Sequence, residues 1–258
     1  MDLSSARHAF VTGGASGLGL GIANALAARG LRITIADILP DLLNDVLSTR
    51  SSSFRGVTLD VRDREGWDRA KAEVEMAFGP VDVLVNNAGI APDGRQFAEM
   101  SPESFDRVLG INLVGVANGL FAFASTMRDR GRGHIVNTAS VGGLSIPGPG
   151  LGGYAVAKYG VVALSETARE ELAPYNVGVS VLCPGFVMTG LGENTARIGG
   201  ELSMSGRIPP PTDVTSAQVG VAVVDGIERN AAYIFTHRDS WPPIEQRMRA
   251  IEDACRQV

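Results

Sequence analysis

Thr12-Gly13-Gly14-Ala15-Ser16-Gly17-Leu18-Gly19 is the stretch that decides the fold. It stands between a short apolar run and a longer amphipathic one. Glycines allow positive φ and let a backbone approach a ligand closely. A helix that starts here directs unpaired N–H groups and its positive dipole end at an anion. The spacing is G-x-x-x-G-x-G, and it predicts a strand, a phosphate-binding turn and a helix, the alternative being a plain tight turn.

The same alternation continues along the chain. Short apolar or β-branched runs, typical of strands covered on both faces, lie at 8–12, 32–36, 54–59, 81–85, 134–138, 177–182 and 232–235. Helical patterns lie at 17–29, 41–48, 64–78, 102–128, 153–172 and 214–229, the fourth opening with the cap signal Ser101-Pro102. The rhythm predicts one α/β domain over residues 1–258, with a Rossmann-like, doubly wound parallel sheet of about seven strands and helices on both faces.

Two stretches break this rhythm. Residues 185–213 are long and rich in Gly and Pro, and a loop of this length is usually functional, so we predict a substrate loop. The tail from Pro242 carries apolar side chains at helical spacing, which predicts a short amphipathic helix on its own subunit or on a neighbour. These side chains are Ile244, Met248, Ile251 and Cys255.

Bulk properties exclude several classes of function. The net charge of −5 argues against nucleic acid as a partner. Two distant cysteines, Cys183 and Cys255, form no disulfide framework and favour a reducing compartment, so we expect a cytoplasmic protein. The uncharged run 108–127 is long enough to span a bilayer, but its polar residues favour burial in protein, and no membrane is expected. The three histidines show no metal-ligand spacing.

Asp37 ends the second predicted strand, at the offset from the glycine turn where an acidic residue binds an adenosine ribose. Its carboxylate can accept hydrogen bonds from both ribose hydroxyls and would repel a 2′-phosphate. Ile38 follows, with no arginine close by. The pattern favours NAD over NADP, the alternative being a helix-capping aspartate.

Tyr154 and Lys158 stand four residues apart on one face of a predicted helix. A free tyrosine has a pKa of about 10, too high for acid–base work at neutral pH. A neighbouring ammonium favours the phenolate, so we expect Lys158 to lower the pKa of Tyr154. The pair predicts a proton donor and acceptor for an alcohol or carbonyl oxygen.

Together these motifs resemble the short-chain dehydrogenase/reductase family over nearly the whole chain. The resemblance is carried, in order, by the glycine turn, Asp60-Val61, Asn86-Asn87-Ala88-Gly89, Asn112, Ser140, Tyr154-x-x-x-Lys158, and Pro184-Gly185 with Val187 and Thr189. It implies that Tyr154 is the general acid/base, that Lys158 lowers its pKa and binds the nicotinamide ribose, and that Ser140 hydrogen-bonds the substrate oxygen. It also implies that Asn112 holds a water of a proton relay; a side chain that stabilises a helix kink is compatible with that role.

The resemblance further implies which residues bind NAD. Asp60 and Val61 would contact adenine, the segment from Asn87 would line the cofactor, and Val187 and Thr189 would meet the carboxamide. The full predicted set is Gly13, Ser16, Gly17, Leu18, Gly19, Asp37, Asp60, Val61, Asn87, Ala88, Gly89, Tyr154, Lys158, Val187 and Thr189. It also implies a homo-oligomer, a tetramer or dimer, formed by helices 102–128 and 153–172.

The expected activity is hydride transfer between NAD(H) and a secondary alcohol or ketone. Candidate pocket walls are largely apolar, which favours a hydrophobic or bulky substrate. They include Ile90, Phe97, Ile146, Leu151, Phe186, Met188, Leu191, Leu202 and Met204. The spacing from Ser140 to Tyr154 is one residue longer than is usual in the family, which widens the pocket mouth or forms a surface bulge. The alternatives are an NADP-dependent reductase of 3-ketoacyl groups on a carrier, and a non-catalytic dinucleotide sensor.

Overall fold

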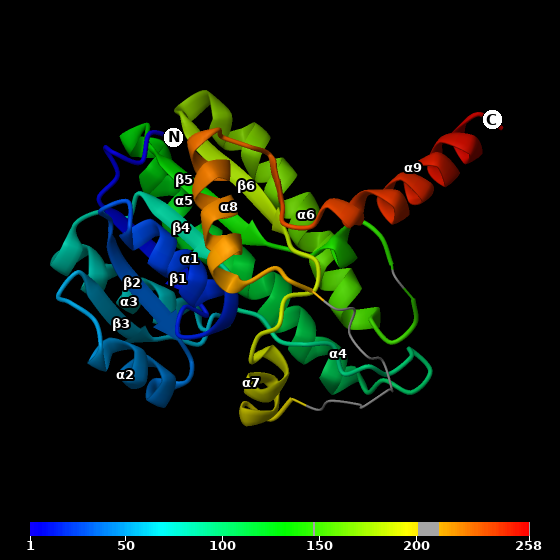
Figure 1. Cartoon of the computed structure of the whole chain (residues 1–258), viewed down its shortest axis with the longest axis horizontal. Helices are drawn as coiled ribbons and strands as arrows, with labels where there is room; N and C mark the ends of the chain where they lie inside the picture. Colours follow the sequence, from blue (N-terminus) through cyan, green and yellow to red (C-terminus); the bar gives the residue numbers. More distant parts are fainter. Residues whose placement is uncertain (147, 201–211, 258) are drawn as a thin grey trace.

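A seven-stranded parallel sheet, in the order β3-β2-β1-β4-β5-β6-β7, forms the centre of the computed structural model (Figure 1). The structure describes residues 1–146, 148–200 and 212–257. The strands are β1 (His8–Thr12), β2 (Arg32–Asp37), β3 (Phe54–Thr58), β4 (Val83–Asn86), β5 (Gly133–Thr138), β6 (Val177–Cys183) and β7 (Tyr233–Phe235). Strands β2 and β3 lie on one side of β1, and β4 to β7 lie on the other. The switch point between β1 and β4 forms a crevice of the kind in which doubly wound sheets bind ligands.

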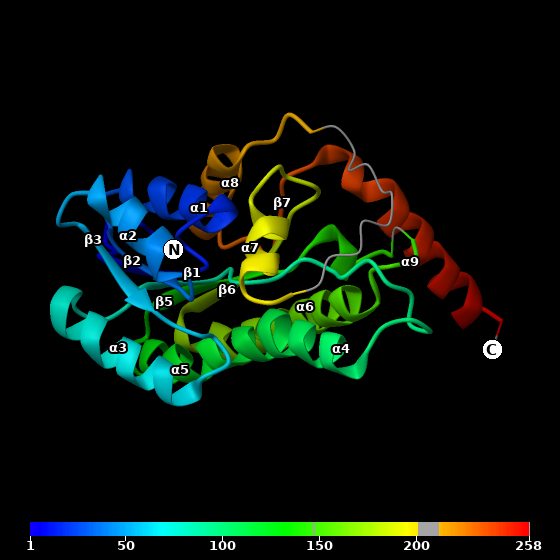
Figure 2. The same cartoon turned by 90° about the horizontal axis from the view of Figure 1, so that it is seen from below.

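Helices cover both faces of the sheet (Figure 2). One layer holds α1 (Gly17–Ala27), α2 (Pro40–Ser48) and α8 (Ser216–Glu228). The other holds α3 (Arg64–Phe78), α4 (Pro102–Leu109), α5 (Gly115–Arg130) and α6 (Gly152–Leu172). The predicted doubly wound α/β fold is therefore confirmed.

Strand β1 shows why the layers form. Its alternate side chains point to opposite faces. Ala9 and Val11 pack in the apolar cluster under α1 and α8, whereas Phe10 packs in the cluster of α3, α5 and α6. All three are fully buried, as expected for a central strand of a parallel sheet.

The long helical pattern at 102–128 is continuous in space but not regular. Ser101 caps α4 by accepting a hydrogen bond from the backbone of Ser104, as the Ser-Pro signal predicts. A π-helical turn, Gly110–Val114, then joins α4 to α5. Such turns are rare and often mark functional sites. The segment Pro102–Arg130 is long and apolar enough to cross a membrane, but half of its most apolar window is buried inside the protein.

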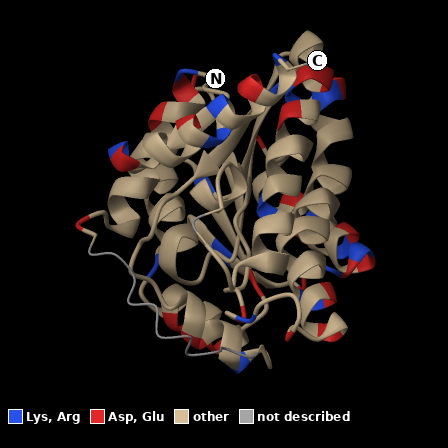
Figure 3. Cartoon of the chain, turned by 90° about the vertical axis from the view of Figure 1, so that its right-hand side faces the viewer, with Lys and Arg blue, Asp and Glu red and all other residues tan. Residues whose placement is uncertain are grey.

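Both stretches that break the predicted rhythm contain helices. Helix α7 (Leu191–Arg197) lies within the predicted substrate loop, whose remaining candidate walls Leu202 and Met204 fall outside the described residues. The predicted tail helix is α9 (Trp241–Cys255), which projects from the body of the molecule (Figures 1 and 2). On the side of the molecule shown in Figure 3, acidic and basic residues are interspersed over the helices.

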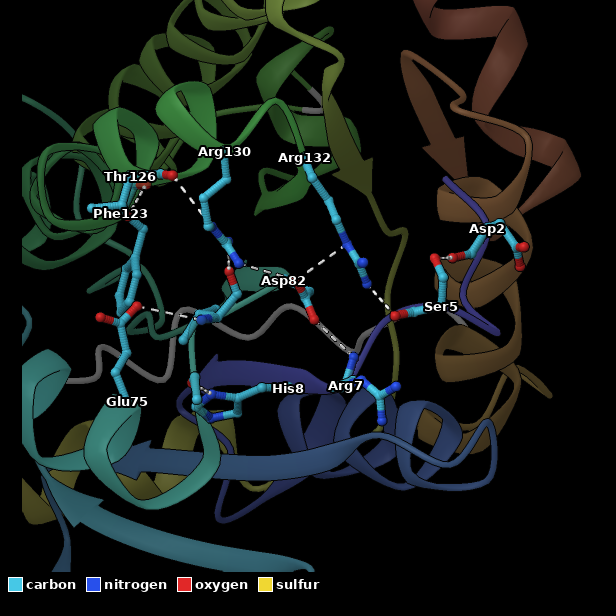
Figure 4. A network of polar contacts seen from close by, with 12 residues as sticks. Asp2, Ser5, Arg7, His8, Glu75, Asp82, Phe123, Thr126, Arg130 and Arg132 are labelled. Carbon is cyan, nitrogen blue, oxygen red and sulfur yellow. Dashed lines mark hydrogen bonds and ion pairs between the residues drawn. The ribbon is translucent and has the colours of Figure 1, made fainter.

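Asp82 ties the amino-terminal edge of the sheet together (Figure 4). One carboxylate oxygen accepts a hydrogen bond from the backbone of Arg7 at 2.8 Å. The other pairs with Arg130 at 3.3 Å and Arg132 at 3.4 Å. Asp82 is buried, so its charge depends on these partners. The network links β1, β4 and α5 at the edge opposite the glycine turn.

Replacing Asp82 with Asn should therefore destabilise the fold without disturbing the glycine turn. Loss of the charge leaves Arg130 and Arg132 without their shared anion, at a cost of about 1–3 kcal/mol in the free energy of unfolding. Urea denaturation measures this, and dinucleotide affinity, measured on the folded variant, should stay within twofold of wild type. An unchanged unfolding midpoint would show that Asp82 has no such role.

Candidate active site

The glycine turn takes the conformation that its sequence requires. Gly13 and Gly17 have φ of 59° and 52°, a region that side chains other than glycine rarely adopt. Gly19 packs so tightly that a Cβ would lie 2.1 Å from the carbonyl oxygen of Gly13. The amide of Asn87 donates to the carbonyls of Thr12 and Gly13, which fixes the turn to the end of β4. The first N–H groups of α1 have no partner within the helix, as at every helix start, and are therefore available to a ligand.

Asp37 ends β2 beside this turn. One oxygen of its carboxylate accepts from the backbone of Ala15 and the other from Leu39, both at 3.2 Å. Burial raises its pKa, while these backbone hydrogen bonds lower it. Because it is partly desolvated, the Asp37 carboxylate would be stabilised by further hydrogen-bond donors. A pair of ribose hydroxyls would supply two.

One continuous cleft joins the glycine turn to Tyr154 and Lys158. It runs along the carboxyl ends of β1, β2, β4, β5 and β6. Thirteen of the predicted site residues line it: Gly13, Ser16, Gly17, Leu18, Asp37, Asp60, Val61, Asn87, Ala88, Gly89, Tyr154, Lys158 and Thr189. The structure thus brings together residues that are up to about two thirds of the chain apart in sequence.

Lys158 is buried at the inner end of the cleft. Its ammonium donates to the carbonyl of Thr138 at the end of β5, at 2.7 Å, and lies 5.6 Å from the centre of the Tyr154 ring. The Ser140 hydroxyl lies close enough to the Tyr154 phenol to lower the pKa of Tyr154. Ser140 also accepts from the backbone of Gly142 at 3.1 Å, which fixes its side chain. A hydroxyl, a phenol and an ammonium therefore meet at one edge of the sheet.

The prediction that the pKa of Tyr154 lies below its ordinary value is wrong for the free protein. Burial raises the pKa of Tyr154, and the hydrogen bond from Ser140 is the opposing influence. Burial also lowers the pKa of Lys158 to about 8. The four-residue spacing predicts that Lys158 lies near Tyr154, but it does not predict that the phenol is buried. Burial has the larger effect on the pKa of Tyr154.

Asn112 lies in the π-helical turn and is completely buried. Its amide donates to the carbonyl of Ile90 at 3.0 Å and accepts from the same residue's N–H at 2.8 Å. The side chain therefore holds the segment that follows Gly89, and a Cβ on Gly89 would lie 3.1 Å from the Asn112 oxygen and 3.8 Å from the Lys158 ammonium. Its role in a water relay stays a prediction.

Two predicted contact residues lie behind the cleft instead of lining it. Gly19 packs against the backbone of Gly13 within the turn. The Val187 side chain is buried in the apolar cluster of α1 and α8. Asp60 lines the cleft but also forms an ion pair with Arg62 at 2.6 Å, which lowers its pKa. The backbone carbonyl of Val61 accepts from the indole of Trp67 at 3.0 Å.

Helix α7 contributes residues that the sequence did not predict. Asn194 donates to the Ser16 hydroxyl at 3.0 Å, and the Thr195 hydroxyl accepts from the backbone of Ala91 at 2.9 Å. Arg197 pairs with Asp41 of α2. These contacts attach α7 to both sides of the cleft. No local signal marks them, because each joins segments that are distant in sequence.

The comparisons with known proteins agree with this geometry. The family model described as "short chain dehydrogenase" matches residues 7–197. The chain belongs to that family. It is an oxidoreductase of the short-chain dehydrogenase type, and the resemblance carried by the sequence motifs is confirmed. Among the described residues, no group of three or more His, Cys, Asp or Glu side chains is placed to hold a metal ion.

Several proteins of known name or known structure are similar to this chain over most of its length. A "C alpha-dehydrogenase" of Sphingobium sp. is 32% identical over 95% of this chain and 85% of its own. A levodione reductase of Leifsonia aquatica is 35% identical over 74% of this chain and 73% of its own. A short-chain dehydrogenase/reductase from Burkholderia phymatum, solved in complex with NAD, superposes with a TM-score of 0.87 at 30% identity, covering 98% and 96% of the two chains.

A pair of glycine substitutions tests the turn. Gly19→Ala forces a Cβ into the Gly13 carbonyl and should weaken dinucleotide binding at least tenfold, with a loss of stability of about 1–3 kcal/mol. Gly190→Ala is the matched control, because its φ is −73° and its Cβ would meet an ordinary contact at 3.7 Å. Fluorescence titration with NADH measures both. Equal affinities in the two variants would contradict the tight-turn assignment.

Proposed function

We propose that this dehydrogenase transfers a hydride between NAD(H) and a hydrophobic secondary alcohol or ketone. The observation that carries the proposal is the single cleft shared by the glycine turn, Asp37, Tyr154 and Lys158. A dinucleotide needs an anion site, a ribose acceptor and a place beside a proton donor, and residues suited to all three line this one cleft.

The residues of the cleft fit a nicotinamide dinucleotide. The start of α1 and the backbone of the glycine turn would hold the pyrophosphate. Asp37 would accept the adenosine ribose hydroxyls, and Lys158 would donate to the ribose at the other end. When bound, the nicotinamide ring accepts or donates the hydride, which is chemistry that side chains cannot supply.

The protein's own task is to manage the proton on the substrate oxygen. In reduction, Tyr154 donates its phenolic proton to that oxygen as the hydride reaches the carbon. Ser140 donates a hydrogen bond to the same oxygen and stabilises the charge that develops there. In oxidation, the phenolate removes the alcohol proton. Lys158 stabilises the phenolate in either direction, since its ammonium lies in the same buried site.

Two features support NAD as the cofactor. The Asp37 carboxylate would repel a 2′-phosphate, and Ile38, also in the cleft, offers no positive charge to bind one. The NAD complex of the Burkholderia phymatum structure is consistent with this choice.

An apolar rim supports a hydrophobic substrate. Phe186 and Met188, between the cleft residues Pro184 and Thr189, are 37% and 74% exposed. Ile90 and Leu191 line the cleft. The similarity to a C alpha-dehydrogenase and to a levodione reductase is consistent with an alcohol or ketone substrate. Three other candidate walls, Phe97, Ile146 and Leu151, line a separate groove on the surface.

The variant Tyr154→Phe tests the proton donor. It keeps the ring and its packing but removes the transferable proton, so turnover of an aromatic ketone should fall at least about 10²–10⁴-fold. NADH affinity should stay within threefold of wild type. Steady-state rates and fluorescence titration measure the two quantities. Turnover close to wild type would remove Tyr154 from the mechanism.

The pH dependence of the two directions should differ. Reduction uses the protonated phenol and the Lys158 ammonium, so kcat/KM for the ketone should hold at neutral pH and fall as the pH rises through about 8, where the buried lysine loses its proton. Oxidation uses the phenolate, so its rate should rise with pH, since burial raises the pKa of Tyr154. Identical profiles in the two directions would argue against this assignment.

Cofactor choice is tested by Asp37→Ser with NADH and NADPH as alternative reductants. Wild type should prefer NADH in kcat/KM. Removing the carboxylate should weaken NADH use about tenfold and relieve the repulsion of NADPH, which shrinks the ratio of the two rates. A wild-type preference for NADPH would overturn the assignment to NAD but leave the Tyr154 chemistry intact.

A further inference from the structure

Helix α9 leaves an apolar face uncovered. Ile244, Met248, Ile251 and Cys255 are spaced four, three and four residues apart, which puts them on one side of the helix. Within this fully described helix, Ile244 is the buried residue. Met248 and Ile251 are 52% and 47% exposed, and α9 projects beyond the body of the molecule (Figures 1 and 2). The face is thus packed at its base and open along the rest.

A helix as short as α9 depends on packing of its apolar face for its stability. Isolated helices shorter than about 12–15 residues are marginal in water, and α9, with 15 residues, is at this limit; in proteins, most of a helix's stability comes from packing an amphipathic face. Two i,i+4 ion pairs, Arg249 with Glu245 and Arg256 with Glu252, support α9, but such pairs add only about 0.2–0.5 kcal/mol each. Burial of the exposed apolar face against another surface would therefore stabilise α9.

A groove lies at the base of the same helix. It has a volume of about 820 Å³, and Arg247 of α9 forms one of its walls by stacking on the Tyr159 ring at 5.0 Å. Its apolar walls include Phe97, Ile146 and Val156, which are 64%, 65% and 44% exposed. The segment that carries the extra residue between Ser140 and Tyr154 lines this groove and not the cofactor cleft.

We infer that a second copy of this chain covers both features, through an antiparallel pair of α9 helices about a twofold axis. Such an axis makes the contact self-complementary, because each copy supplies one projecting helix and one groove. The antiparallel direction lays the carboxyl end of the partner's helix over the base of α9. That is where the groove opens.

The side chains of α9 fit this pairing in one register. If Met248 faces the partner's Ile251, then Arg247 faces the partner's Glu252, and the partner's Cys255 lies over the base of α9, where Ile244 is already buried in its own subunit. Apolar side chains meet apolar ones, and the cation at the rim of the groove meets an anion. The pairing goes beyond the proposed activity, since no residue of the α9 face lines the cofactor cleft.

Single substitutions on the exposed face test the contact. Met248→Asp and Ile251→Asp, made separately, should each raise the dissociation constant of the assembly at least tenfold in sedimentation velocity. Met76→Asp on α3 is the matched control, because Met76 is 86% exposed and lies far from α9, and it should leave the mass unchanged. Association unchanged by either α9 substitution would overturn the proposal and leave the groove to a small molecule or another protein.

The register is tested by charge reversal. Arg247→Glu should weaken association, and adding Glu252→Arg should restore it. Residues five apart on a helix do not face each other, so the rescue has to come from the partner. Failure of the double variant to regain association would rule out this register.

Cys255 provides an independent distance. It is exposed, whereas Cys183, the other cysteine, is buried, so a spin label attaches to Cys255 alone. In the antiparallel pair, two labels should lie about 20 Å apart, given a rise of 1.5 Å per residue and packed helices. Absence of an intermolecular distance near this value in the assembled protein would contradict the proposal, with Cys255→Ser as the unlabelled control.

Discussion

The buried ammonium of Lys158 is the constraint on which the site depends. Removing a charge from water costs several kcal/mol unless it is hydrogen-bonded, and the Thr138 carbonyl at the end of β5 accepts from it at 2.7 Å. This bond fixes the first turns of α6 against the carboxyl edge of the sheet. Tyr154 lies one turn earlier on the same helix, so its phenol is held at that edge too. The chemistry of the cleft follows from where this helix is fixed.

The same edge collects the groups that a dinucleotide requires. Parallel strands all end there, so the glycine turn after β1, Asp37 after β2 and Asn87 after β4 meet in space although the sequence separates them. The other edge serves stability instead, through the Asp82 network. This division places the cleft at one edge of the sheet and the buried ion pairs of Asp82 at the other.

Much of this could be predicted from the sequence, because it rests on local signals. Apolar runs and glycine spacing locate the strands and the turn. A carboxylate that ends a parallel strand, as Asp37 does, must lie at the carboxyl edge of the sheet. What the sequence did not predict depends on tertiary contact. The segment after Thr189 contains few apolar residues in helical order, yet α7 forms there because Asn194, Thr195 and Arg197 reach distant partners. The pKa of Tyr154 was predicted in the wrong direction, because burial is not visible in four-residue spacing.

The most direct test of the account is the ionisation of Tyr154 itself, measured as the tyrosinate absorbance of wild type minus that of Tyr154→Phe across a pH series, with and without NAD⁺. In the free protein, the phenol should ionise above the ordinary tyrosine range, since burial raises its pKa. With NAD⁺ bound, a second positive charge enters the same cleft, so ionisation should move to lower pH. A tyrosine that titrates like an exposed one, and is unmoved by NAD⁺, would contradict the claim that phenol, ammonium and cofactor share one buried site.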